Sequence, residues 1–163
     1  MKKVVPDAYN YIQEYYHLWH EIDKLYDEYA KAVGMPASTL YVLYVIYMQQ
    51  ENCTQKFIVE KGKMTKPTVN VAITGFIEQG WVTLEESPTD RRNKLVTLTD
   101  SGKAYAEKII PGLLDAERTA MDKLGEQFRE ELMHSTRLYY ENFKQAIMNA
   151  IEEENNNGEN QAR

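Results

Sequence analysis

The sequence predicts a mainly α-helical protein with one small β-hairpin, and three observations lead to this fold class. Apolar residues recur every three or four positions over most of the chain, which is the spacing of amphipathic helices. Between residues 82 and 98 the period changes to two, on either side of a polar loop, as in the strands of a hairpin. Thr, Gly and Pro stand where these helices would begin and end.

The first 50 residues predict two helices. Tyr, Trp and aliphatic residues form one wide stripe over about residues 7–33, and Gly34 is expected to end this long helix. Pro36 opens a second helix over residues 37–50. Because that helix is apolar nearly all round, we expect it in the core.

Residues 53–80 predict a helix-turn-helix. Thr54 is expected to cap a helix over residues 55–61, and Gly62 to end it in the left-handed conformation. Thr65 caps the next helix, which runs to about Gln79 and has Pro67 in its first turn. A helix of this length, ~21 Å, can lie across the major groove of B-DNA.

The hairpin completes a winged helix-turn-helix. Val82 and Leu84 share one face of the first strand, and Val96 and Leu98 share one face of the second. The loop 86–93 is too long for a tight turn and too polar to be buried. In this architecture the second helix reads the major groove, and an arginine of the wing reaches phosphates or the minor groove.

The second helix of the motif divides into two faces. The side expected to face DNA carries Thr65, Lys66, Thr68, Asn70, Val71 and Thr74. The side expected to pack inward carries Val69, Ala72, Ile73, Phe76 and Ile77. Asn can bond adenine edges and Lys66 can reach phosphate or guanine, whereas the alternative is an ordinary solvated polar face. Gly75 weakens a helix interior, so we expect close packing against it.

The expected DNA contacts of the wing are Asp90, Arg91, Arg92 and Lys94. Arg91 would enter the minor groove with Asp90 holding its guanidinium group, and Arg92 or Lys94 would contact phosphate. The alternative is a surface ion pair worth less than ~1 kcal/mol.

The last third of the chain predicts further helices. Thr99 can cap a helix that starts near Ser101, and Pro111 is expected to kink this helix without ending it. The chain turns near Gly125 into a last helix. Residues 152–163 hold no hydrophobic residue except one alanine and are expected to be disordered.

Three segments between residues 77 and 102 resemble the multiple-antibiotic-resistance regulator (MarR) family of bacterial transcription factors. They are Ile-Glu-Gln-Gly-Trp-Val at residues 77–82, Asp-Arg-Arg at residues 90–92 and Leu-Thr-x-x-Gly at residues 98–102. The resemblance covers most of the chain. It implies long helices that pack across a two-fold axis, so we expect dimerisation helices at residues 1–35 and 101–151 around a DNA-binding lobe at residues 36–100. A symmetric dimer places two reading helices ~34 Å apart, matching a pseudo-palindromic site.

The resemblance also implies a small aromatic or phenolic effector, bound between the dimerisation helices and the DNA-binding lobe. The chain has 12 tyrosines, many of them in its first two helices. The expected pocket residues are Tyr15, Trp19 and Tyr44. The alternative is that these rings serve core and dimer packing.

Composition fits a DNA-binding protein only when the distribution of charge is considered. The net charge of the 163 residues is −6, yet residues 54–94 carry seven basic and five acidic side chains. The positive charge is therefore on the candidate reading unit. No apolar run approaches the ~18 residues that span a membrane, and the start lacks a signal peptide, so we expect a cytoplasmic protein.

Other functions are less well supported by the sequence. Cys53, the single cysteine, near a helix start is expected to be a small buried hydrophobe, although a redox sensor stays open. His17 and His20 share a helix side but lack further ligands nearby for a metal. No catalytic motif is present, and we expect no enzyme and no cofactor. The prediction is a ligand-responsive repressor; the alternatives are a protein-interaction module and a metal- or redox-responsive regulator of the same fold.

Overall fold

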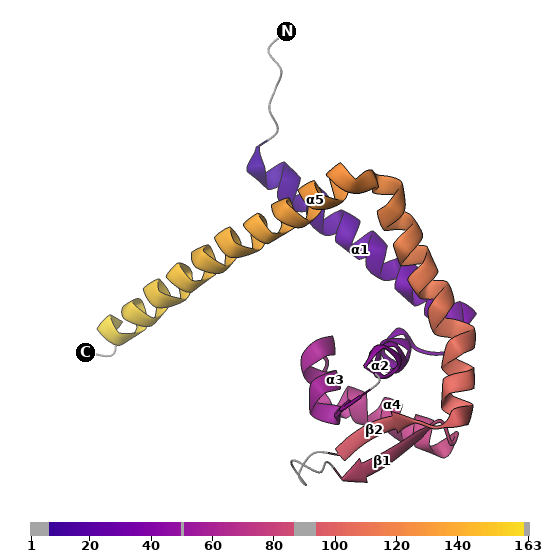
Figure 1. The fold of residues 1–163 in the computed structure, drawn as a ribbon. Coiled ribbons are helices and arrows are strands. Elements are labelled where there is room, and N and C mark those ends of the chain that lie inside the picture. Colours follow the sequence, from indigo (N-terminus) through magenta and orange to yellow (C-terminus); the bar gives the residue numbers. More distant parts are fainter. Residues whose placement is uncertain (1–6, 50, 87–93, 162–163) are drawn as a thin grey trace. The chain divides into compact units, whose positions relative to one another are not determined.

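The computed structural model describes residues 7–49, 51–86 and 94–161, and it separates into two compact units, Met1–Leu114 and Asp115–Arg163. The predicted fold class, mainly helical with one small hairpin in a winged helix-turn-helix, is confirmed (Figure 1). The elements are α1 (Ala8–Ala32), α2 (Ala37–Met48), α3 (Gln55–Gly62), α4 (Lys66–Glu78), β1 (Val82–Glu86), β2 (Lys94–Leu98) and α5 (Asp100–Gln161). Among the described residues, no helix is long and apolar enough to cross a membrane.

The core of the first unit is built around α2. Every other element of the first unit, which is called the lobe from here on, contributes to the buried core. Its members include Ala30, Leu40, Val42, Leu43, Val45, Ile46, Ile58, Val69, Ile73, Phe76, Val82, Val96 and Ile110. This explains why α2 is apolar nearly all round, since α1, α3, α4 and β2 all contact it. The prediction that α2 is a core helix is confirmed.

The hairpin has the register that its alternation predicts. Val82 pairs with Leu98, and Leu84 pairs with Val96, so the four apolar side chains share one face. The Cys53 carbonyl oxygen accepts a hydrogen bond of 2.7 Å from the Val96 N–H. The hairpin is thereby held against the segment that leads into α3.

The turn between α3 and α4 corrects one prediction. Gly62 is the last residue of α3, and Lys63 takes the left-handed conformation instead, with φ 47°. A Cβ on Gly62 would lie 2.7 Å from Met64 Cε and 3.0 Å from Tyr41 Cε1. Glycine is therefore favoured at position 62 because a larger side chain would clash there, and not because the backbone needs a positive φ.

The end of α1 is fixed to the first turns of α5. The Tyr29 hydroxyl donates a hydrogen bond of 2.6 Å to the Ile109 carbonyl oxygen, and a Cβ on Gly112 would come within 2.8 Å of that hydroxyl oxygen. Gly34, with φ 80°, follows α1 as predicted. Pro111 lies inside α5, which continues past it as predicted.

The second unit is helical and has one break. Gly125 has φ 74° and ψ 164°, which confirms the turn predicted there. The prediction of a disordered tail from residue 152 differs from the structure, in which α5 extends to Gln161. Adding residues to an existing helix avoids the cost of nucleation, so a polar segment without core contacts can stay helical.

Candidate nucleic-acid interface

The N-terminus of α4 is organised by its own side chains. Thr65 Oγ1 accepts a hydrogen bond of 3.3 Å from the Thr68 N–H and lies 2.8 Å from the Thr68 hydroxyl oxygen. Pro67 lies in the first turn, where no intrahelical N–H is required. Both features were predicted, and together they define where the helix begins.

The two faces of α4 differ in burial. Val69, Ala72, Ile73 and Phe76 are buried, which places the opposite side of the helix at the surface. Thr65, Lys66, Asn70, Val71 and Thr74 are exposed, and Thr68 is half-buried beside its Thr65 partner. Five of the six residues predicted to face DNA are thus free of the core. Lys66, Asn70 and Thr74 are four residues apart and form one polar stripe.

Two predictions for α4 are wrong. Ile77 was expected to pack inward, but its side chain is 43% exposed. Gly75 was expected to lie against a close neighbour, but a Cβ there would meet no atom within 4 Å. Both residues lie on the last turn of α4, beside the buried Phe76 but on the side of the helix that the core does not cover.

Positive charge lies beside α4 along the described part of the motif. Lys56, Lys61, Lys63 and Lys66 are all exposed on α3, the turn and α4. Lys56 lies 3.8 Å from Glu60 in an exposed pair, which contributes little to stability. Lys94 is exposed at the start of β2, opposite Glu86. The predicted wing residues Asp90, Arg91 and Arg92 lie outside the described residues.

Cys53 is enclosed. Its side chain is 3% exposed, and burial raises the pKa of the thiol to about 11. A thiol with a raised pKa has little of the thiolate that reacts with oxidants. The environment therefore favours the interpretation of Cys53 as a small buried hydrophobe. Among the described residues, no three His, Cys, Asp or Glu side chains come together as a metal site.

The predicted effector residues lie on two helices. Tyr15 and Trp19 on α1 are one turn apart, with ring centroids separated by 6.2 Å in an edge-to-face arrangement. Tyr44 on α2 stacks with Tyr41 at 6.0 Å. One cavity in the described part of the first unit has none of these three residues in its lining.

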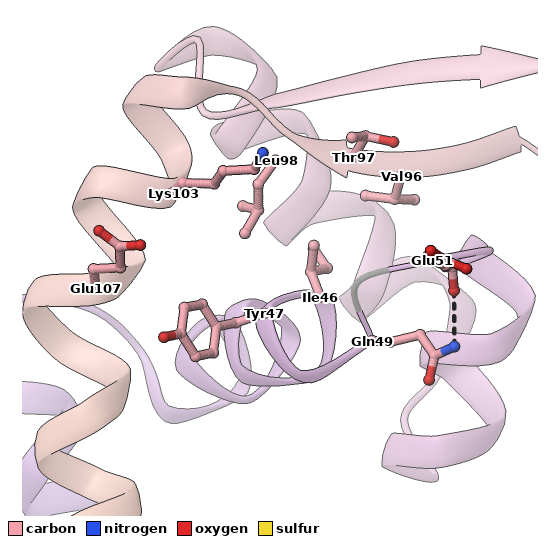
Figure 2. A pocket seen from close by; sticks show the side chains of 9 residues that line it. All are labelled: Ile46, Tyr47, Gln49, Glu51, Val96, Thr97, Leu98, Lys103 and Glu107. Atoms are coloured by element: carbon pink, nitrogen blue, oxygen red, sulfur yellow. Dashed lines mark hydrogen bonds between the residues drawn. The ribbon is translucent and has the colours of Figure 1, made fainter.

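That cavity lies between α2, β2 and the first turns of α5 (Figure 2). Its volume is about 440 Å³. Ile46, Val96 and Leu98 provide its apolar side, and Tyr47, Lys103 and Glu107 provide polar groups at its margin. Its lining residues lie between positions 46 and 107 and belong to different elements. The spacing of residues within a single helix therefore could not predict this cavity.

The contacts made by the Leu-Thr-x-x-Gly segment were not predicted from the sequence. Thr99 caps α5 as predicted, by accepting a hydrogen bond of 3.0 Å from the Gly102 N–H. In addition, its hydroxyl donates to the Gly80 carbonyl oxygen, 19 residues earlier. The only signal was the motif itself, which marked a resemblance but had no assigned contact.

Comparisons with known proteins agree with this architecture. Residues 33–93 match the model of the MarR family. None of the curated proteins matches the chain. The structure of NMB1585, a MarR family regulator from Neisseria meningitidis, is 24% identical, with a TM-score of 0.70 over 83% of this chain and 95% of that one.

Two further solved structures share the fold at lower identity. The MepR–DNA complex of Staphylococcus aureus is 21% identical, with a TM-score of 0.65 over 85% of this chain and 99% of that one. BpsR of Bordetella bronchiseptica, described with regulation of its DNA binding by 6-hydroxynicotinic acid, is 20% identical, with a TM-score of 0.57 over 76% and 91% of the two chains. These likenesses show the fold, and the match to the MarR family model covers residues 33–93, from the end of α1 through β1.

Proposed function

We propose that this protein is a sequence-specific DNA-binding transcription regulator that represses by occluding a promoter. The observation that carries the proposal is the polar stripe of Lys66, Asn70 and Thr74 on a capped helix whose opposite side is buried. Such a helix can enter a major groove without losing core contacts. The family match and the related MepR–DNA complex support the same function.

The proposed DNA-binding form is a homodimer. Large apolar side chains are exposed along α1 and along the second unit, including Leu25 at 63% and Phe128 at 60%. Exposed apolar surface on this scale is typical of an interaction surface. Two copies of α4 related by a two-fold axis would read a pseudo-palindrome. Such a regulator acts on the chromosome, so its cytoplasmic location is part of the proposal.

The proposed repressor responds to a small ligand, as the related BpsR does to 6-hydroxynicotinic acid. A ligand that changes the separation of the two α4 helices by a few ångströms would break their match to the operator. The candidate pocket is that of Tyr15, Trp19 and Tyr44, and the 440 Å³ cavity beside Tyr47 is a second place to test. Operator binding that no aromatic acid or phenol weakens in a screen would contradict this step.

The site is tested by selecting bound sequences from random DNA duplexes. The wild type is expected to enrich a two-fold symmetric motif. Asn70→Ala should cost about 1–3 kcal/mol on the enriched site and relax the preference for one base pair in each half. If Arg91 enters the minor groove, Arg91→Ala should also lose affinity.

A matched pair of lysines separates DNA contact from net charge. Lys66→Ala should weaken binding and lower the slope of log affinity against log salt by about 1 for each half-site. Lys108→Ala removes the same charge from an exposed position on α5 and should leave the slope unchanged. Failure of the wild type to enrich any sequence at low salt would reject the proposal in favour of a protein-interaction module.

A further inference from the structure

The junction between the end of α4 and the start of α5 is held by several short contacts. Both sides of this junction belong to the first unit. We call it the α4–α5 clasp, and it consists of Gly80, Trp81, Thr99, Ser101, Gly102 and Tyr105.

The α4 side of the clasp is a closed helix end. The Gly80 N–H donates to the Ile77 carbonyl oxygen at 2.9 Å, and the Trp81 N–H donates to the Phe76 carbonyl oxygen at 2.8 Å. With Gly80 at φ 71°, this is the Schellman pattern of hydrogen bonds. The pattern leaves the carbonyl groups of Gly80 and Trp81 available to another element.

The α5 side supplies donors to both carbonyl groups. The hydroxyls of Thr99 and Ser101 lie 2.7 and 2.9 Å from the Gly80 carbonyl oxygen, and the Thr99 N–H donates to the Trp81 carbonyl oxygen at 2.9 Å. Each hydroxyl has one proton. Both protons can therefore be used on Gly80 at the same time as Thr99 Oγ1 accepts the Gly102 N–H that caps α5.

The remaining contacts leave no space between the two backbones. A Cβ on Gly102 would come within 2.0 Å of the Trp81 carbonyl oxygen, so only glycine fits there without a shift. Three residues further along α5, the Tyr105 ring stacks on the Trp81 ring with centroids 3.7 Å apart and planes at 17°. The end of α4 is thus fixed to α5 by backbone, hydroxyl and aromatic contacts together.

We infer that the clasp residues are positioning residues for DNA reading, which set the angle at which α4 enters the groove. This inference rests on the proposed function, because it takes α4 as the reading helix. The 13 residues of α4 extend ~20 Å from the clasp to Thr65. A tilt of about 10° at the clasped end moves the opposite end by ~3 Å, which is the length of a hydrogen bond to a base.

The test compares two operators rather than one affinity. Wild type is measured on the enriched operator and on the same operator with one base pair inserted between its half-sites. The measured quantity is the affinity for the enriched operator divided by the affinity for the operator with the insertion. Thr99→Val, which removes the hydroxyl, and Gly102→Ala should reduce this ratio at least threefold. Thr99→Ser keeps the hydroxyl and should keep the ratio. Loss of folded protein lowers both affinities equally, so an unchanged ratio in the first two variants overturns the inference.

A measurement without DNA keeps the inference separate from the proposed function. Spin labels at Asn70→Cys on α4 and Lys108→Cys on α5 report their distance within one chain when labelled protein is diluted with unlabelled protein. Native Cys53 is buried and should stay unlabelled. The distance distribution should be narrow in wild type and Thr99→Ser and broader in Thr99→Val and Gly102→Ala. Unchanged distance distributions in Thr99→Val and Gly102→Ala overturn the inference. A wild type that enriches no operator rejects the proposed function. In that case the distances still decide whether the clasp positions α4.

Discussion

The winged helix-turn-helix lobe and the second unit carry apolar side chains at the same helical spacing but differ in what they do with them. In the lobe, Leu43 and Ile58 are 0% exposed and Ile73 is 1% exposed. In the second unit, Phe128 is 60% exposed and Leu138 is 53% exposed. An amphipathic pattern therefore predicts a helix with an apolar face, whereas the partner that covers this face depends on which surfaces are within reach of the chain.

The largest effect is expected in the lobe. Leu43→Ala should lower the free energy of unfolding by about 3 kcal/mol, because a cavity remains where α2 meets the surrounding elements. Val71→Ala, at a side chain that is 73% exposed, should change it by less than about 0.5 kcal/mol. Urea unfolding at one fixed protein concentration measures both. Equal losses in the two variants would contradict the burial described for α2.

The buried thiol of the lobe predicts a dependence of stability on pH. The pKa of Cys53 in the folded protein is raised to about 11 by burial, above the ~8.5 of an unfolded chain. Between these values the unfolded chain releases a proton that the folded protein keeps, so stability that is present below about pH 8.5 is lost as the pH rises towards 11.

The size of this loss should be on the order of 2 kcal/mol. Other groups also titrate in this range, so the relevant quantity is the difference in slope between the wild type and Cys53→Ala in urea unfolding at several pH values. A thiol reagent should modify the native protein at pH 8 only after denaturant is added. Fast modification without denaturant would restore the redox-sensor alternative.

Substitutions of exposed apolar residues in the second unit should weaken self-association and leave the stability of the lobe unchanged. Phe128→Ser should weaken self-association about 30-fold, equivalent to ~2 kcal/mol, if the proposed dimer buries this ring. Glu130→Ser changes an exposed charged residue two positions away and serves as the control. Sedimentation velocity over a dilution series measures the dissociation constant. An unchanged constant in Phe128→Ser would place the dimer contact elsewhere.

The smallest effect has the opposite sign. Gly75 lies inside α4 with open space where a Cβ would be, so Gly75→Ala should stabilise the protein by about 0.5–1 kcal/mol through a less flexible unfolded chain. Gly102→Ala meets the Trp81 backbone and should destabilise it. Thermal unfolding of the two variants decides between open space and the close packing expected from the sequence at Gly75. A loss of stability in Gly75→Ala would support close packing.

Features of the fold that have local causes could be predicted from the residue types alone. Thr54, Thr65 and Thr99 cap the helices that follow them, because a side-chain oxygen can reach an N–H three residues on. The alternation of residues 82–98 predicted that Val82 and Val96 share one face, because side chains alternate between the two faces of a strand. The buried side of α4 also followed from its period, except at its last turn.

Roles that depend on residues far apart in the chain could not be predicted and come from the packing of the first unit. A Cβ on Gly62 would meet the Met64 and Tyr41 side chains. Ile77 is exposed at the end of α4, and Thr99 holds that end through Gly80. The cavity beside Tyr47 likewise combines α2 with β2 and α5. Periodicity and capping act over three or four residues, whereas these contacts join positions about twenty or more residues apart, and packing of the whole lobe selects them.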